Sequence, residues 1–140
     1  MRNTFYEFID HTADLGFIVR AGSRKELYEK TARAVFDIIV DLPTVRQDVI
    51  QPVEVSGDDR EQLMVNWLNE LLFLYETRGM LFRSFDIKEI NDNHLKAECS
   101  GESYRAGVHR IKKEIKAATY HQILVSEDRD GWTLRIIFDI

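Results

Sequence analysis

Apolar residues recur at helical spacing in two long segments of this chain. The first begins at Ser23, which forms a capping box with Glu26, and ends before Pro43. The second follows a similar box, Asp58 with Glu61, and ends at Gly79. The repeating positions are Leu27, Thr31, Ala34, Val35, Ile38 and Ile39 in the first segment and Met64, Trp67, Leu68, Leu71, Leu72 and Tyr75 in the second. The spacing predicts two helices that each bury one face.

Other segments are rich in β-branched residues or alternate apolar with polar side chains, which is typical of strands. They span residues 4–9, 15–20, 45–55, 82–90, 94–100, 115–125 and 132–140. Pro52 predicts that the third is an edge strand, and Asp130-Gly131 predicts a hairpin turn between the last two. The order predicts an α+β fold with two helices packed on one side of a largely antiparallel sheet. We expect residues 1–140 to form a single domain, since that length buries a core without staples.

The composition narrows the class of protein. The formal net charge of −5 argues against broad affinity for a nucleic-acid backbone, so we expect no large RNA footprint. Cys99 is the only cysteine, and no signal peptide or membrane-spanning run is visible, which predicts a cytoplasmic protein without a membrane partner. Glycine-rich phosphate loops and the common zinc and serine-nucleophile motifs are absent. A self-contained enzyme is therefore the less favoured reading.

Carboxylates mark the two ends of the chain. Asp14 follows the first predicted strand, and the last strand reaches Asp139 and Ile140. Trp132 to Phe138 alternate, so Asp139 points away from the apolar face. An aspartate in a turn commonly bonds nearby amides, and that reading is favoured for Asp14 alone. If the loop with His11 and Asp14 lies beside the last strand, the α-carboxylate of Ile140 joins the two aspartates. Such a set suits a hard divalent cation, calcium or else magnesium or manganese.

Two further groups of residues carry candidate chemistry. Segment 116–121, from Lys116 to His121, breaks strand alternation with small residues, which indicates close packing against a neighbour. His121 is either a functional group, together with His11, or a histidine bonded to backbone. Glu102 either ends a strand or lies near these histidines. A basic cluster is a solvated face or a contact for phosphates or an acidic partner; its members are Arg105, His109, Arg110, Lys112, Lys113 and Lys116.

Four motifs together resemble the archease family over the whole chain. They are His11-Thr12-Ala13-Asp14, Gly101-Glu102 with Tyr104, Lys116-Ala117-Ala118-Thr119-Tyr120-His121, and the terminal Asp139-Ile140. One departure is Arg105, which stands where the family commonly carries an aspartate.

The resemblance implies a non-enzymatic accessory protein of the GTP-dependent (RtcB-type) RNA ligase of tRNA splicing and RNA repair. Such a protein promotes ligase guanylylation and multiple turnover. The resemblance also implies a bound cation, usually calcium, with Asp14, Asp139 and the carboxylate of Ile140 as ligands, and a functional face with His11, Glu102, Lys116 and His121. The alternatives are a chaperone-like partner of a tRNA cytosine methyltransferase and a metal-dependent phosphoesterase with His121 as base.

Overall fold

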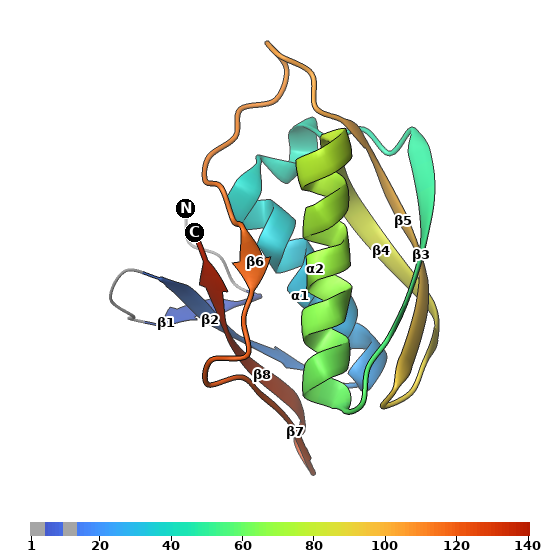
Figure 1. The fold of residues 1–140 in the computed structure, drawn as a ribbon, viewed down its shortest axis with the longest axis vertical. Helices are drawn as coiled ribbons and strands as arrows, with labels where there is room; N and C mark the ends of the chain where they lie inside the picture. The colour runs from blue at the N-terminus through green and yellow to red at the C-terminus, as the bar shows by residue number, and fades with distance from the viewer. Residues whose placement is uncertain (1–4, 10–13) are drawn as a thin grey trace.

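The computed structural model describes residues 5–9 and 14–140, and in this part of the chain two long helices lie between two antiparallel sheets (Figure 1). Helix α1 spans Arg24–Ile39 and α2 spans Arg60–Arg78, and a short 3-10 turn, η1, spans Leu42–Thr44. The prediction of an α+β fold with two helices and largely antiparallel strands is confirmed. The described strands divide between two sheets, one on each side of the helix pair, which the sequence pattern did not distinguish.

The larger sheet is built around the C-terminal strand. Its strands are β1 (Glu7–Ile9), β2 (Leu15–Ala21), β8 (Gly131–Asp139), β6 (Ala117–Ala118) and β7 (Leu124–Asp128). β2 lies along one edge of β8, while β6 and β7 pair in turn with the other edge. Two segments far apart in sequence, the start of β2 and the end of β8, therefore lie side by side.

The smaller sheet has the order β3-β5-β4, with β3 at Val49–Ser56, β4 at Met80–Ile90 and β5 at His94–Ser103. β3 is an edge strand, as Pro52 predicts. The core fills the space between the sheets and the helices, where Phe17, Trp67 and Phe82 are fully buried. No helix in the described residues is long and apolar enough to cross a membrane.

Both helices begin at a capped residue, and one cap differs from the expectation. Ser23 caps α1 by accepting a hydrogen bond from the Glu26 amide, as predicted. The α2 cap is Asp59, not Asp58, and it accepts from the Gln62 amide at 2.8 Å. Glu61 is not part of that box, because its carboxylate accepts a hydrogen bond from the Val125 amide. The cap therefore moves by one residue, and Glu61 links α2 to β7.

The predicted strand 115–125 is divided into β6 and β7. Asn69 of α2 binds both backbone groups of Ala118, accepting from its N–H at 2.7 Å and donating to its carbonyl at 3.3 Å. The chain then turns at Gln122, whose φ is 55°, and pairing with β8 resumes at Leu124. The strand is interrupted for two reasons. The Asn69 side chain forms hydrogen bonds with the backbone of Ala118, and Gln122 adopts a left-handed backbone conformation.

Candidate metal centre and a buried glutamate network

Asp14 and Asp139 occupy the same end of two adjacent strands. The last registered pair between β2 and β8 is Leu15 with Phe138. Asp14 precedes Leu15 and Asp139 follows Phe138, so the register, continued by one residue, sets the two aspartates opposite each other. Opposite residues of an antiparallel pair project to the same face. The register therefore places the two residues that the sequence suggested as cation ligands at the same end of the adjacent strands β2 and β8.

The backbone of Asp139 is held from both sides. β2 lies along one edge, and on the other edge Asp139 is registered with Ala117 and accepts a hydrogen bond from the Lys116 amide at 2.9 Å. Ile140 follows directly and is 39% exposed, so its carboxylate lies at the same strand end. Lys116 is exposed beside it. Because its backbone is held, Asp139 loses little further freedom when its side-chain carboxylate binds a ligand.

The donor chemistry of this strand end fits a hard cation. Two aspartates and a terminal carboxylate supply only oxygen atoms, which calcium and magnesium prefer. Among the residues that the structure describes, no three His, Cys, Asp or Glu side chains form a group that could hold a metal ion. The expected set has only two side chains, Asp14 and Asp139, and depends on the carboxylate of Ile140 for its third donor. His11 lies outside the described residues.

His121 lies on the same edge of β8 as Lys116, in the turn between β6 and β7. Its amide donates to the hydroxyl of Thr119, which in turn donates to the Ile137 carbonyl at 2.8 Å. Its neighbour Gln122 accepts a hydrogen bond from Arg135 at 3.0 Å. The ring is exposed. The structure therefore places His121 along β8 from Asp139, and both of its expected roles stay open.

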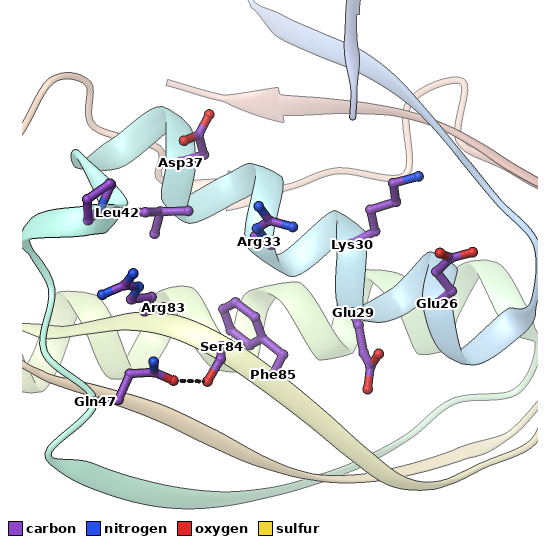
Figure 2. Close-up of a pocket in the computed structure, with 11 residues that line it drawn as sticks. Glu26, Glu29, Lys30, Arg33, Asp37, Leu42, Gln47, Arg83, Ser84 and Phe85 are labelled. Carbon is purple, nitrogen blue, oxygen red and sulfur yellow. Dashed lines mark hydrogen bonds between the residues drawn. The ribbon is translucent and has the colours of Figure 1, made fainter. Parts of the chain in front are cut away.

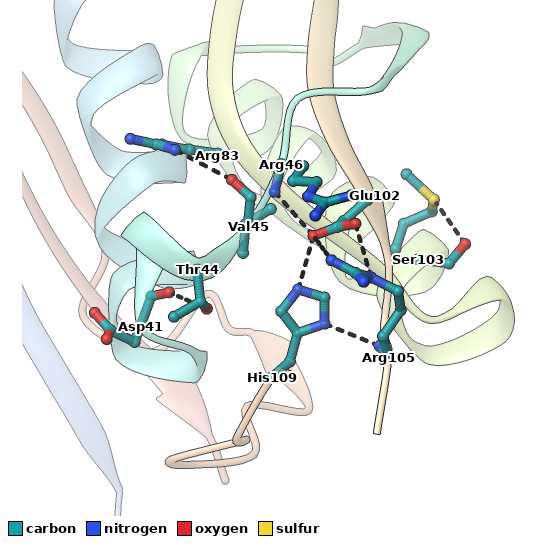
Figure 3. A network of polar contacts seen from close by, with 10 residues as sticks. Asp41, Thr44, Val45, Arg46, Arg83, Glu102, Ser103, Arg105 and His109 are labelled. Carbon is teal, nitrogen blue, oxygen red and sulfur yellow. Dashed lines mark hydrogen bonds and ion pairs between the residues drawn. The ribbon is translucent and has the colours of Figure 1, made fainter. Parts of the chain in front are cut away.

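Glu102 belongs to the other sheet and is almost completely buried, with 6% of its surface exposed. Its carboxylate accepts hydrogen bonds from the Arg46 amide at 2.9 Å, from Arg105 at 3.1 Å and from His109 at 2.8 Å (Figure 3). The Arg46 amide, followed by Arg105 and His109, lowers the pKa of Glu102 from 4.5 to about 2. The described histidine beside Glu102 is thus His109, whereas His121, which the sequence suggested, lies along β8 in the other sheet.

His109 acts as a bridge in this network. Its Nδ1 accepts a hydrogen bond from the Arg105 amide at 2.9 Å, so the ring proton lies on Nε2 and is donated to Glu102. The side chain is fully shielded from solvent. Two members of the expected basic cluster, His109 and Arg105, are therefore internal partners of a buried carboxylate. Sequence reasoning missed this role, although Glu102, Arg105 and His109 recur at spacings of three and four.

The rest of the basic cluster lies on an extended segment that we call the 104–116 strap. The strap is tied down by Lys112, whose amide donates to the Ile39 carbonyl at 2.7 Å, and by Glu114, which accepts a hydrogen bond from Tyr75 at 2.7 Å. Within the strap, the Ile115 side chain is buried. The exposed cations of the strap are Arg110, Lys112, Lys113 and Lys116. These four cations lie on the stretch of chain between Glu102 and the strand β6 that pairs with Asp139, with the exposed Glu114 among them.

Comparison with known proteins agrees with this geometry. The archease protein family (MTH1598/TM1083) matches residues 6–140. Archeases from Methanosarcina acetivorans and Pyrococcus abyssi are each 37% identical over 139 residues, covering 96% of this chain and 95% and 98% of theirs.

Two solved structures are similar. The solution structure of Methanobacterium thermoautotrophicum protein 1598 gives a TM-score of 0.79 at 37% identity, covering 96% of this chain and 98% of that one. A crystal structure of an archease from Thermotoga maritima gives a TM-score of 0.65 at 20% identity, covering 100% of this chain and 98% of that one, and shows the shared fold. By sequence and by fold, the chain belongs to the archease family.

Proposed function

We propose that this archease activates a GTP-dependent (RtcB-type) RNA ligase of tRNA splicing and RNA repair in the cytoplasm, promoting ligase guanylylation and multiple turnover. The observation that supports the proposal is the register of β2 on β8, whose last pair is Leu15 with Phe138, so that Asp14 and Asp139 lie at the same end of two adjacent strands, next to Ile140. Asp14 and Asp139 each belong to one of the sequence motifs that resemble the family. Family membership over residues 6–140 supports the same conclusion.

A divalent cation, calcium in the first instance, belongs to the proposal. Asp14, Asp139 and the carboxylate of Ile140 would hold it, and magnesium or manganese would suit the same oxygen donors. When bound, the ion would supply a concentrated positive charge that attracts phosphate oxygens. The chain itself contributes the rigid backbone of Asp139, held between β2 and β6, and the adjacent cation Lys116. We propose that this face, with His121 along the same strand edge, docks at the nucleotide site of the ligase.

The state of the candidate catalytic groups supports an accessory role. Burial raises the pKa of the Cys99 thiol from 9.0 to about 12, so thiolate chemistry is suppressed near neutral pH. Glu102 is already engaged by three donors and lies in the other sheet from His121. Glu102 is therefore not a free base beside the proposed cation, and a phosphoesterase would depend on His121, which lies along β8 from Asp139. Turnover of a phosphodiester by the isolated protein would favour that alternative over the accessory role.

The decisive experiment is multiple-turnover RNA ligation by the cognate ligase, with and without this protein. Wild type should accelerate turnover, and Asp139→Asn should lose that effect because it removes a ligand charge. Asp130→Asn is the matched control, since Asp130 lies in the turn at the opposite end of the β7–β8 hairpin. Acceleration by Asp139→Asn equal to wild type would exclude the carboxylate site from the activity, and no acceleration by wild type would refute the ligase role.

A second candidate is a chaperone-like partner of a tRNA cytosine methyltransferase. It is favoured by one observation, namely that the Thermotoga maritima archease is described as a possible chaperone. Co-purification of this protein with the methyltransferase and with the ligase would separate the candidates. Binding to the methyltransferase alone, with improved solubility of that enzyme, would replace the ligase proposal.

A further inference from the structure

A polar pocket of about 650 Å³ lies between α1 and the edge strand β4, away from the residues discussed so far (Figure 2). Its walls carry Lys30 and Arg33 from α1, Gln47 from the segment after η1, and Arg83 and Ser84 from β4. Phe85, which is 8% exposed, forms part of the floor. The volume is that of a small-molecule site, and too large for a single ion.

Arg83 is directed into this pocket by an irregularity in β4. Phe82 is registered with Gly101 of β5 and Ser84 with Ser100, so Arg83 is the extra residue of a β-bulge. Bulges re-aim a side chain and are enriched beside functional sites. The close approach of the strands requires glycine at position 101, where a Cβ atom would lie 1.9 Å from the Leu81 carbonyl oxygen.

The guanidinium groups on the two walls retain unused donors. Arg83 donates to the Val45 carbonyl at 3.2 Å, which uses one of five N–H groups. Arg33 lies over the Phe5 ring at 4.5 Å, a contact that orients the guanidinium plane without using an N–H. Among the described residues neither arginine is part of an ion pair. Gln47 accepts a hydrogen bond from Ser84, which leaves the amide NH₂ of Gln47 as a further donor at the pocket.

The acidic residues of the pocket are engaged by other parts of the chain. Glu29 accepts the Ile87 amide at 2.8 Å, Glu26 accepts the Gly22 amide at 2.6 Å, and Asp37 accepts the Tyr6 hydroxyl at 2.9 Å. Glu26 and Glu29 lie toward the start of α1, beyond Lys30 from Arg33 and Arg83 (Figure 2). Asp37 lies beyond Arg33 at the other end of the pocket, so the cationic part has acidic side chains on both sides (Figure 2). This arrangement disfavours an extended polyanion such as a nucleic-acid strand.

We propose that this pocket binds the phosphomonoester group of a small ligand between Arg33 and Arg83. A phosphomonoester carries about −1.5 to −2 charges at neutral pH and three acceptor oxygens, which matches two guanidinium forks and one amide. A carboxylate has fewer acceptors and half the charge. The site is independent of the carboxylates at Asp14 and Asp139, so it can be tested without the ligase.

The test is an amide NMR titration of the full chain with inorganic phosphate, adenosine 5′-monophosphate and acetate. We expect saturable shifts of the Gln47 side-chain amide and the Ser84 backbone amide with both phosphate probes, and weaker binding of acetate. Arg83→Gln should weaken phosphate binding about tenfold, the loss expected for charge-assisted hydrogen bonds. Glu29→Gln keeps the acceptor for Ile87 but removes a negative charge, so it should strengthen binding.

Lys113→Gln, which removes an exposed charge from the 104–116 strap, is the matched control and should change nothing. Equal weakening by Lys113→Gln, shifts centred on Arg110 to Lys116, or equal binding of acetate would each overturn the proposal. If Arg83→Gln does not fold, as judged by its NMR spectrum, Arg33→Gln on the opposite wall decides the question in the same way.

Discussion

The Nε2 atom of His109 lies 2.8 Å from the carboxylate of Glu102, and the two side chains are only 0% and 8% exposed. The pair fixes the start of the 104–116 strap to the end of β5. Because Nδ1 of the same ring accepts the Arg105 amide, one imidazole satisfies a backbone donor and a buried acid together. The network therefore anchors the strap, and we expect its loss to lower the free energy of unfolding.

Replacing His109 by leucine tests this anchor. His109→Leu fills the space with an apolar side chain, but it removes one donor from the buried Glu102 carboxylate, which keeps the Arg46 amide, and it leaves the Arg105 amide without its acceptor. Unpartnered buried groups cost about 1–3 kcal/mol each, so the free energy of unfolding in urea should fall by about that amount. His121→Leu is the control, since an exposed substitution changes stability by about 0.5 kcal/mol or less. Equal effects of the two substitutions would contradict the anchoring role.

The lowered pKa of Glu102 predicts a pH dependence of stability. A carboxyl group whose pKa falls on folding, here from 4.5 to about 2, contributes stability that is fully present above pH 4.5 and lost as the pH falls toward 2. Wild type should therefore lose more stability between pH 4.5 and 2 than Glu102→Gln does. Urea unfolding at several pH values measures the difference. Glu127→Gln, at an exposed site on β7, should follow wild type, and parallel curves for wild type and Glu102→Gln would refute the assignment.

Arg105 is the residue at which this chain departs from the motif that the sequence resemblance implies. In this chain its guanidinium donates to Glu102 at 3.1 Å, so an arginine here neutralises the buried acid. Arg105→Asp should lower the melting temperature at pH 7 through repulsion of like charges, and the deficit should shrink below about pH 4, where carboxyl groups protonate. Arg110→Asp makes the same change of charge at an exposed site and should have little effect. A deficit that does not depend on pH would point to lost packing instead.

Gly101 permits the approach of β4 at the bulge that carries Arg83. Gly101→Ala places a Cβ atom 1.9 Å from a backbone oxygen that cannot move without breaking the sheet. At Gly107 an added Cβ atom would meet open space, but the φ of +86° costs an alanine about 1–2 kcal/mol. Gly101→Ala should therefore be the more destabilising of the two in thermal unfolding. The reverse order would show that the strand pair relaxes at the bulge.

The helices and hairpins were predictable because they depend on local patterns. Apolar spacing and the Ser23 cap specify α1, and Pro52 specifies an edge strand. The pattern does not say which strands pair, since alternation identifies a buried face but not the neighbour across it. The division into two sheets and the break of strand 115–125 at Asn69 therefore required the structure.

The candidate site was predictable in part, for a similar reason. Asp14 and Asp139 were singled out by their type and position, yet only the register of β2 on β8 shows that they lie at the same end of adjacent strands. The partner of Glu102 was missed because His109 lies in a segment without regular structure, where spacing carries no geometric meaning. The Arg46 amide offers no sequence signal, since every residue but proline has one.

The terminal carboxylate gives the sharpest test of the proposed cation site. Adding residues after Ile140 converts that carboxylate into a neutral amide, while the pairing of Asp139 with β2 and β6 is retained. Calcium affinity, measured by titration calorimetry, should fall by about tenfold or more, because affinity depends on the number of ligand charges. Asp14→Asn should give a loss of the same order, and an extension before Met1 should leave the affinity unchanged. Affinity should also decline below about pH 4 as the carboxylates protonate. Equal affinity with the free and the extended C-terminus would remove Ile140 from the ligand set. Asp14 and Asp139 would then be the only charged donors of the proposed site.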